Sequence, residues 1–361
     1  MTKPLPGSGV TGRTIIGYKR RRLTIRAHLI GRVTITVLLR AEDEPARTRV
    51  DYWQHVVGTS LAAYQLRGSG ETLRGEIRQA RVGALTVLDF QMADTHAVRA
   101  PDLIRKSGPR LVKVDLGIRG QGRYEQEGRQ NLLAPGEFQL LDLSRPSHVD
   151  VDESQKLSIA IFPRALLPVR DNDLRDLTAV RFGPDDAYAS LVASMGRELA
   201  RNLGAYDGAS SARIGSAFLD LLALAVATRL GRVDSVPAES RQQAMMARIE
   251  AFAEQHLANP ALSPGMIAAA HHISVRTLHK MYEAEDWTVA AWIRHLRLER
   301  CRQDLLDPDL AGRPVAAVGA RWGFSDAAVF SRAFRTAYGL PPAEFRTIHG
   351  SPPAEASGYL R

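Results

Sequence analysis

The chain has 361 residues, enough for two domains or three small ones that each bury a core. Its 45% apolar and 24% charged residues are typical of a soluble globular protein, and the single cysteine, Cys301, excludes an internal disulfide framework and favours the reducing cytoplasm. The net charge of +9 suggests nucleic-acid binding, but residues 1–49 alone contribute +8, with 11 basic and 3 acidic residues, while residues 241–361 contribute only +2.

The first 48 residues form a basic tail, which we predict to be disordered or to result from the choice of start codon. The run Lys19–Arg22 and the apolar stretch after it are similar to a signal sequence, but Arg26 and Arg32 interrupt that stretch and no small-residue cleavage site follows. Contact of the polybasic run with DNA stays open as an alternative. We therefore predict no membrane association.

Residues 49–165 are predicted to form a sensor or dimerisation domain rich in β-strands. An amphipathic helix is expected over Asp51–Leu61, followed by short strands with period-two apolar patterns and Gly or Pro between them. Regular spacing of short strands indicates a β-barrel or a sandwich. The expected strands are 83–90, 110–117, 122–126, 138–143 and 156–162.

Residues 166–232 turn helical and are predicted to be a connector or dimerisation region. Helices are expected over 187–202 and 210–230, and the second is apolar around much of its circumference, so it is buried or pairs with a partner. Asp220 inside that helix argues against a membrane span. Residues 231–240 are polar and aperiodic, and we place a linker over 233–241.

Residues 242–348 carry the same pattern twice, and residues 349–361 are predicted to be a flexible C-terminus. A helix over 242–257 leads into the first copy, residues 267–282, and the second copy is residues 318–334. In each copy a small Ala-rich helix ends at a turn and a second helix follows. The structural N-caps are predicted to be Ser263, Ser274 and Ser325.

The second helix of each copy has one apolar and one polar face, as in a helix-turn-helix that enters the DNA major groove. Leu278 and Tyr282 are expected to face inward in the first copy, as are Phe330 and Phe334 in the second. Arg332 is the strongest base reader, because arginine can bind guanine O6 and N7 together. The predicted DNA-binding residues are Val275, Arg276, His279, Lys280, Asp326, Ala327, Ala328, Ser331, Arg332 and Arg335.

Some of these residues have a second interpretation. Asp326 either accepts from a cytosine amine or favours the helix dipole in the first turn. Ala327 and Ala328 either contact a thymine methyl or simply favour the helix. Cys301 is interpreted as a core residue of the helix over 289–306, whose 18 residues would be roughly 27 Å long and could set two recognition helices about one DNA turn apart.

The repeat resembles the paired helix-turn-helix domain of the AraC/XylS family of transcription regulators. The second-copy signature runs from Ala320 through Phe330–Arg335 to Tyr338–Arg346, and the resemblance covers about residues 242–346. Residues 49–165 are similar to the cupin-like sensor domain of part of that family. The resemblance implies an α+β multidomain protein: a cupin-like β-barrel with a helical extension, and an all-α domain with two helix-turn-helix units joined by a linker helix.

Two other classes of function compete with that of a regulator. A cupin enzyme fused to a DNA reader would need clustered histidines, but His55, His96 and His148 lie far apart, so we predict no catalytic residues, metal or cofactor. An architectural protein that binds DNA without sequence preference should have a strongly basic domain, unlike residues 241–361.

The sequence therefore predicts a cytoplasmic bacterial regulator that binds double-stranded promoter or operator DNA. A ligand-responsive activator that acts as a homodimer on RNA polymerase is what the resemblance implies. Repression stays open as the alternative, and the ligand-binding residues are unknown.

Overall fold

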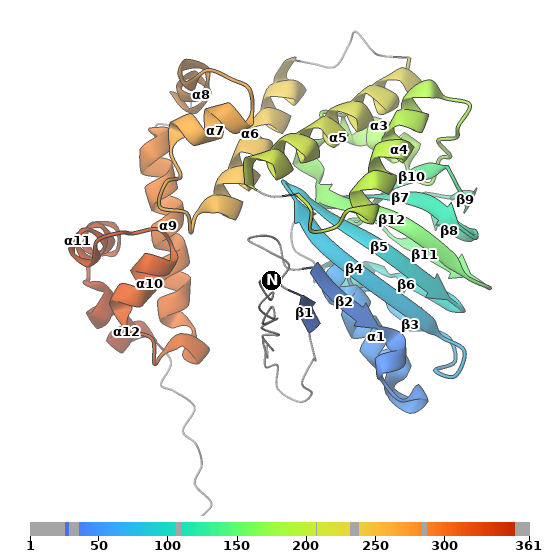
Figure 1. Cartoon of the computed structure of the whole chain (residues 1–361), viewed down its shortest axis with the longest axis horizontal. Coiled ribbons are helices and arrows are strands. Elements are labelled where there is room, and N and C mark those ends of the chain that lie inside the picture. The colour runs from blue at the N-terminus through green and yellow to red at the C-terminus, as the bar shows by residue number, and fades with distance from the viewer. Residues whose placement is uncertain are drawn as a thin grey trace, which may run out of the picture. The chain divides into compact units, whose positions relative to one another are not determined.

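The computed structural model describes residues 26–28, 36–105, 110–206, 208–231, 238–283 and 287–350 (Figure 1). The chain divides into two compact units between Ala247 and Arg248, inside helix α6 (Ala238–His256). The first unit contains the strands and helices α1–α5, and the second contains helices only after α6. This arrangement confirms the predicted cupin-like β-domain with a helical extension, followed by an all-α domain.

The first unit is built on two antiparallel sheets (Figure 1). The larger sheet has the order β1-β2-β4-β5-β12-β7-β10, and the smaller has the order β3-β6-β11-β8-β9. The larger sheet comprises β1 (Arg26–His28), β2 (Thr36–Arg40), β4 (Arg74–Val82), β5 (Leu85–Ala93), β12 (Gln155–Pro163), β7 (Leu111–Arg119) and β10 (Phe138–Asp142). The smaller comprises β3 (Gln65–Arg67), β6 (Thr95–Arg99), β11 (Ser147–Val151), β8 (Gly122–Gln126) and β9 (Arg129–Leu133).

Alternation along the strands gives the larger sheet two buried faces. Val112, Val114 and Leu116 of β7 pack in a core that includes residues of helices α4 (Ala187–Arg201) and α5 (Gly208–Arg229). Leu157 and Ile159 of β12 instead pack in a second core, which includes residues of the smaller sheet. The larger sheet therefore separates a helix-side core from a core between the sheets.

Helix α5 is long and apolar enough to cross a membrane by length and composition alone, although half of its most apolar window is buried inside the unit. Phe218, Leu222 and Val226 recur at four-residue steps and are fully buried in the helix-side core. Packing against the sheet therefore accounts for its apolar character.

The prediction of a disordered tail over residues 1–48 is wrong for its last part. Strand β2 pairs with β4, the 3₁₀ helix η1 covers Ala41–Asp43, and helix α1 runs from Ala46 to Ser60, starting five residues before the predicted Asp51. Backbone pairing with a strand more than 30 residues away holds this segment, and its charged composition gave no signal of it. Residues 1–25 and 29–35 of the predicted tail lie outside the described residues.

Two shorter helices, α2 (Pro101–Arg105) and α3 (Asp171–Leu177), and the 3₁₀ helix η2 (Arg164–Leu166) complete the first unit. The predicted linker is partly wrong, because residues 238–240 already belong to α6, while residues 232–237 lie outside the described residues. Residues 351–361 of the predicted flexible C-terminus also lie outside them.

The second unit is a chain of helices around a connecting helix, α9, which covers Val289–Leu306 as predicted. Helices α7 (Pro264–Ala270) and α8 (Val275–Tyr282) precede it. The 3₁₀ helix η4 (Pro308–Leu310), α10 (Val315–Arg321), α11 (Ala327–Tyr338) and α12 (Pro342–His349) follow it. The predicted pair of helix-turn-helix units is therefore α7–α8 and α10–α11.

Candidate nucleic-acid interface

The first helix-turn-helix is closed at each step by a local hydrogen bond. Ser263 caps α7 by accepting from Met266 N–H, and Ser274 caps α8 by accepting from Thr277 N–H at 2.9 Å. Between the helices, His272 takes a left-handed φ of 54° and Ile273 N–H donates to the Ala268 carbonyl. Both predicted serine caps are confirmed here.

The second helix-turn-helix closes α10 in the same way but has a turn one residue longer. Gly323 takes the left-handed φ, 83°, and Phe324 N–H donates to the Gly319 carbonyl at 3.1 Å. The next helix is then capped by Asp326, whose Oδ1 accepts from Val329 N–H at 2.8 Å. The prediction of Ser325 as the N-cap is wrong, because the additional turn residue moves the cap one position along the chain.

Asp326 has the role of a helix cap rather than a free acceptor on the surface. Hydrogen bonds from the backbone N–H groups of Val329 and Ala328, and then the charge of Arg332, hold the pKa of its carboxyl below the usual range. A carboxylate at a helix N-terminus also interacts favourably with the helix dipole. The structure therefore favours the dipole interpretation over acceptance from cytosine.

The caps put the two recognition helices in a common register. Counting from Ser274 and from Asp326, Leu278 matches Phe330 and Tyr282 matches Phe334, and all four side chains are buried. The inward faces predicted from the sequence are thus confirmed. Lys280 and Arg332 occupy equivalent positions on the two helices.

The opposite faces of both helices are open to solvent. Ser331 is half-buried; the other predicted DNA-binding residues are exposed, namely Val275, Arg276, His279, Lys280, Asp326, Ala327, Ala328, Arg332 and Arg335. Sequence reasoning omitted two exposed residues at equivalent positions, Thr277 and Val329, of which Val329 is 47% exposed. Aligning the two helices by their caps would have found both residues, because an exposed valine in the first turn of one helix matches a threonine in the other.

The apolar side of helix α9 packs against the second helix-turn-helix. Leu298, Cys301 and Leu305 of α9 pack in one cluster with Phe330 and Phe334 of α11. Cys301 is fully buried, its Sγ lies 3.8 Å from the Val318 carbonyl oxygen, and burial raises the pKa of its thiol to about 12. This confirms Cys301 as a core residue and excludes a reactive thiolate near neutral pH.

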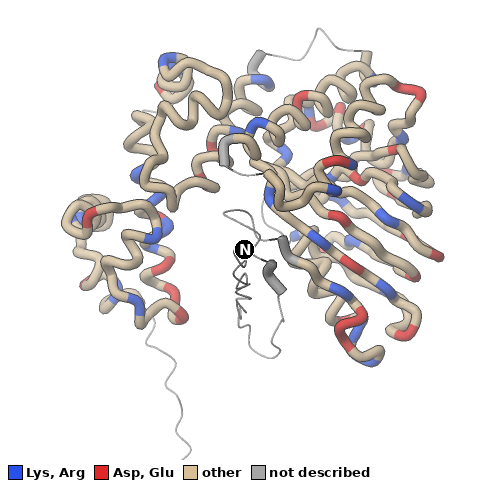
Figure 2. Tube along the Cα trace, viewed as in Figure 1, with Lys and Arg blue, Asp and Glu red and all other residues tan. Residues whose placement is uncertain are grey.

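Figure 2 shows Lys and Arg interspersed with Asp and Glu along the helices of the second unit. Some of these charges are paired: Arg302 lies 2.5 Å from Glu299 on α9, and Arg321 lies 3.1 Å from Asp304. Basic residues on the exposed faces of α8 and α11 have no such partner among the described residues; Arg276, Lys280, Arg332 and Arg335 are the four. The unpaired basic side chains of α8 and α11 therefore lie on the solvent-exposed faces of these helices.

The first unit contains a charged group that sequence reasoning missed. Lys113 and Asp115 of β7 form an ion pair of 2.9 Å with side chains only 4% and 0% exposed. The ammonium of Lys113 also lies about 5.8 Å from the ring of Tyr124, from the smaller sheet, so the pair is between the sheets. Burial lowers the pKa of Lys113, but the charge of Asp115 and the hydrogen bond to it outweigh burial and the pKa is raised. In the sequence, such a buried ion pair is indicated by two opposite charges two positions apart in an otherwise apolar strand.

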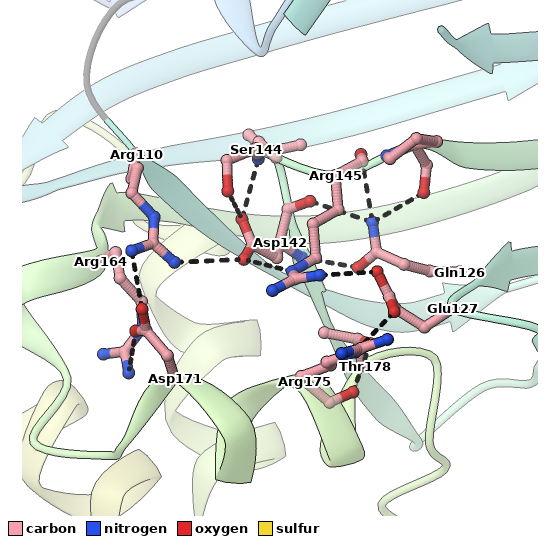
Figure 3. A network of polar contacts seen from close by, with 12 residues as sticks. Arg110, Gln126, Glu127, Asp142, Ser144, Arg145, Arg164, Asp171, Arg175 and Thr178 are labelled. Atoms are coloured by element: carbon pink, nitrogen blue, oxygen red, sulfur yellow. Dashed lines mark hydrogen bonds and ion pairs between the residues drawn. The ribbon is translucent and has the colours of Figure 1, made fainter. Parts of the chain in front are cut away.

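A second polar network joins the sandwich formed by the two sheets to helix α3 (Figure 3). Glu127 accepts from Arg145 at 2.9 Å and from Arg175 of α3 at 2.8 Å, and Arg110 donates to Asp171 at 2.8 Å. Burial raises the pKa of Glu127, but the two arginine hydrogen bonds outweigh it and the pKa is lowered. These bonds connect the tip of a β-hairpin with the connector region.

Within the described ranges, no group of three His, Cys, Asp or Glu side chains could hold a metal ion. Of the three histidines weighed as ligands, His96 is bonded to Asp150 through Nδ1 at 2.9 Å.

Comparison with known proteins finds a matching domain family for each of the two units. A helix-turn-helix domain model matches residues 267–348, and an AraC-binding-like domain model matches residues 53–226. The chain is 30% identical over 253 residues to the transcriptional activator NphR of a Rhodococcus species, which covers 69% of this chain and 74% of that protein.

More distant matches include the XylDLEGF operon transcriptional activator 1 of Pseudomonas putida, 22% identical over 63% of this chain and 72% of that protein. The crystal structure of the AraC-like transcriptional activator CuxR is 20% identical, with a TM-score of 0.47 over 73% of this chain and 94% of that chain.

Proposed function

The chain belongs to the AraC/XylS family of DNA-binding transcription regulators, and we propose that it reads two successive major grooves of one operator through α8 and α11. The observation that carries this proposal is the common register of the two helices: each buries one apolar pair and turns its basic side chains outward. The length of α9, 18 residues or roughly 27 Å, is suited to helices spaced about one DNA turn apart. Operators would then be asymmetric or directly repeated.

The residues have separate roles in this proposal. Arg332 reads a guanine bidentately, and Arg276 and His279 contact base edges from α8. Lys280, at the position equivalent to Arg332, reaches a base or a phosphate. The exposed Val329 lies one turn before Arg332 and joins Val275, Ala327 and Ala328 as apolar surface for thymine methyl groups.

We assign the regulatory role to the first unit. Its sandwich senses a small molecule or dimerises, and the network of Figure 3 couples the sandwich to α3. Tyr188 and Leu191, exposed three residues apart on α4, provide apolar surface for a homodimer. By analogy with NphR, a transcriptional activator, the protein activates transcription with RNA polymerase, in the cytoplasm, without catalytic activity of its own.

Sequence-specific reading is tested by measuring affinity against unrelated DNA. An operator is first selected from a random library with the full chain, and its affinity is then compared with that of a scrambled duplex at one fixed salt concentration. We expect the selected duplex to bind about a thousandfold tighter or more. Equal affinities would favour an architectural protein that binds only the backbone.

The spacing of the two grooves is tested on the same operator. Insertion of five base pairs between the two contacted segments rotates one of them by about half a turn relative to the other. We expect this insertion to weaken binding strongly and an insertion of ten base pairs to weaken it less. Equal effects of both insertions would contradict a rigid arrangement of α8 and α11 around α9.

A further inference from the structure

A cleft of about 480 Å³ opens on the helix side of the larger sheet, beside the end of α4. Helix α4 packs against β12, β5 and β7 (Figure 1), and its last turn, with Arg197, Ala200 and Arg201, forms one wall of the cleft. The cleft is lined by Arg78, Asp89, Ile118, Arg119, Lys156, Arg197, Ala200 and Arg201. Its volume falls within the range of small-molecule sites.

The lining holds five cations and a single carboxylate. Asp89 is shared by two of the cations: Lys156 lies 3.0 Å from it and Arg78 lies 3.6 Å from it. Arg201 pairs outside the lining, with Glu198 at 2.8 Å. The acidic groups at this place therefore cannot neutralise its positive charge.

Arg119 and Arg197 are the two cations with no acidic partner among the described residues. Arg119 lies directly opposite Lys156 in the β7–β12 pairing. Because Lys156 and Arg78 already share Asp89, that carboxylate is not free to balance the charge of Arg119. The unpaired charge of Arg119 therefore lies at the same place as the open volume of the cleft.

The backbone is also irregular at this position. The register of β12 against β7 shifts between Lys156 and Leu157, which leaves Ile118 outside the regular pairing. Such bulges redirect side chains, and here both Ile118 and Arg119 line the cleft. A regular strand would have sent consecutive side chains to opposite faces.

We propose that this cleft binds a small anion with phosphate or carboxylate groups. Arg119 and Arg197 provide the free guanidinium groups, which bind such groups bidentately, and Lys156 adds a point charge. An anion that binds the folded cleft balances its surplus positive charge and so stabilises the first unit. A regulatory effect of this anion on operator binding rests on the proposed function, whereas its binding does not.

Binding is measured by calorimetry on the full chain without DNA, at constant ionic strength. Pyrophosphate and citrate are the probes, and the tighter one identifies whether phosphate or carboxylate is preferred. In the double variant Arg119→Gln, Arg197→Gln we expect binding to weaken about tenfold or more, because charge-assisted hydrogen bonds are lost. The matched control is Arg47→Gln with Arg67→Gln, which removes two exposed charges elsewhere in the first unit.

The double variant should unfold at nearly the temperature of the unaltered chain, because neither arginine is fully buried or has an acidic partner among the described residues, so a loss of binding would not reflect misfolding. The proposal is overturned if neither probe binds, or if both double variants weaken binding equally. It is also overturned if the cleft variant weakens operator binding without any probe present, since the cleft would then contact DNA phosphates. Because the calorimetry omits DNA, its failure leaves the assignment of α8 and α11 intact.

Discussion

The two helix-turn-helix units reach the same backbone shape with different side chains. Both first helices have seven residues and are closed by the same backbone hydrogen bond across five residues, from Ile273 to Ala268 and from Phe324 to Gly319. The position after the first helix holds a buried histidine, His271, in one unit, and Trp322 in the other. The indole N–H of Trp322 donates to Asp304 at 2.9 Å, whereas the buried Nε2 of His271 has no hydrogen-bond partner in the described part of the chain.

This difference shows that the hydrogen bonds of the turn, rather than particular side chains, define the motif. A left-handed residue closes the first helix in each case, but one unit uses histidine and the other uses glycine. The second helix is capped by an uncharged serine in the first helix-turn-helix and by an ionised aspartate in the second. The two units should therefore respond differently to pH and to substitution, which separates them experimentally.

The largest expected difference is a loss of stability of the first helix-turn-helix, α7–α8, in mild acid. Burial, then the charges of Arg248 and His272, lower the pKa of His271 from 6.5 to about 4. A depressed histidine pKa means that stability is full above pH 6.5 and falls as the pH drops toward 4. The loss across this window is on the order of 3 kcal/mol, at about 1.4 kcal/mol per pKa unit.

The measurement is hydrogen exchange of α7 and α8 in the full chain between pH 7 and pH 4.5, with rates corrected for intrinsic exchange. In His271→Phe, which keeps an aromatic ring against Phe252, the first helix-turn-helix should lose this pH dependence. Helices α10 and α11 serve as an internal control. An equal loss of protection in both units would show that His271 is not its cause.

A second difference concerns the left-handed residues. A Cβ at Gly323 would lie 2.8 Å from the Leu257 carbonyl oxygen, and left-handed backbone costs other residues about 1–2 kcal/mol. We therefore expect Gly323→Ala to lower the free energy of opening of α10 and α11 by at least this amount. His272→Gly should raise that of α7 and α8 by less, since glycine gains backbone entropy on unfolding. Exchange rates that move the opposite way in either variant would contradict the assigned turns.

The third difference concerns DNA. Arg332→Ala should weaken binding to the selected operator by about 1–3 kcal/mol, roughly 5- to 150-fold, and relax preference at one base pair. Lys280→Ala, at the equivalent position of α8, separates a base contact from a phosphate contact, because only a base contact changes the sequence preference. Arg47→Ala is the matched control, an exposed arginine of the first unit. Operator affinity unchanged by Arg332→Ala would refute its role as a reader.

The sequence predicted elements well where a periodic apolar pattern met a clear boundary. The strand over 122–126 and the helix over 289–306 have the observed limits, because glycine begins the first and Thr288 caps the second. Strand β4, with Arg, Glu and Gln at five of its nine positions, was missed. Its partners β2 and β5 decide its structure, and no local pattern reports such pairing.

The site was predictable to the extent that it depends on helix faces. Leu278, Tyr282, Phe330 and Phe334 are inward because of their spacing alone. The cap of α11 was not predictable in the same way, because Ser325 and Asp326 are both good capping residues and only the length of the turn chooses between them. That length follows from the bond that closes α10, which is a property of the folded backbone.

The smallest difference tests this cap assignment directly. Ser274→Ala should lower the stability of α8 by about 1 kcal/mol, the usual cost of a lost N-cap. Asp326→Ala should destabilise α11, whereas Asp326→Asn keeps the capping oxygen and should be milder. Ser325→Ala should have no measurable effect, although it removes a similar hydroxyl one residue away. Hydrogen exchange of α8 and α11 at pH 7 measures all four variants.

Lowering the pH provides a further test of the cap of α11 that the alanine variants do not provide. The pKa of Asp326 is lowered in the folded protein, so its contribution is present above the ordinary aspartate pKa and is lost as the pH falls through the lowered value. Ser274 does not titrate, so the cap of α8 persists there. If Ser325→Ala weakened α11 as much as Asp326→Ala, both residues would share the cap and the longer turn would not fix a single register for the second recognition helix.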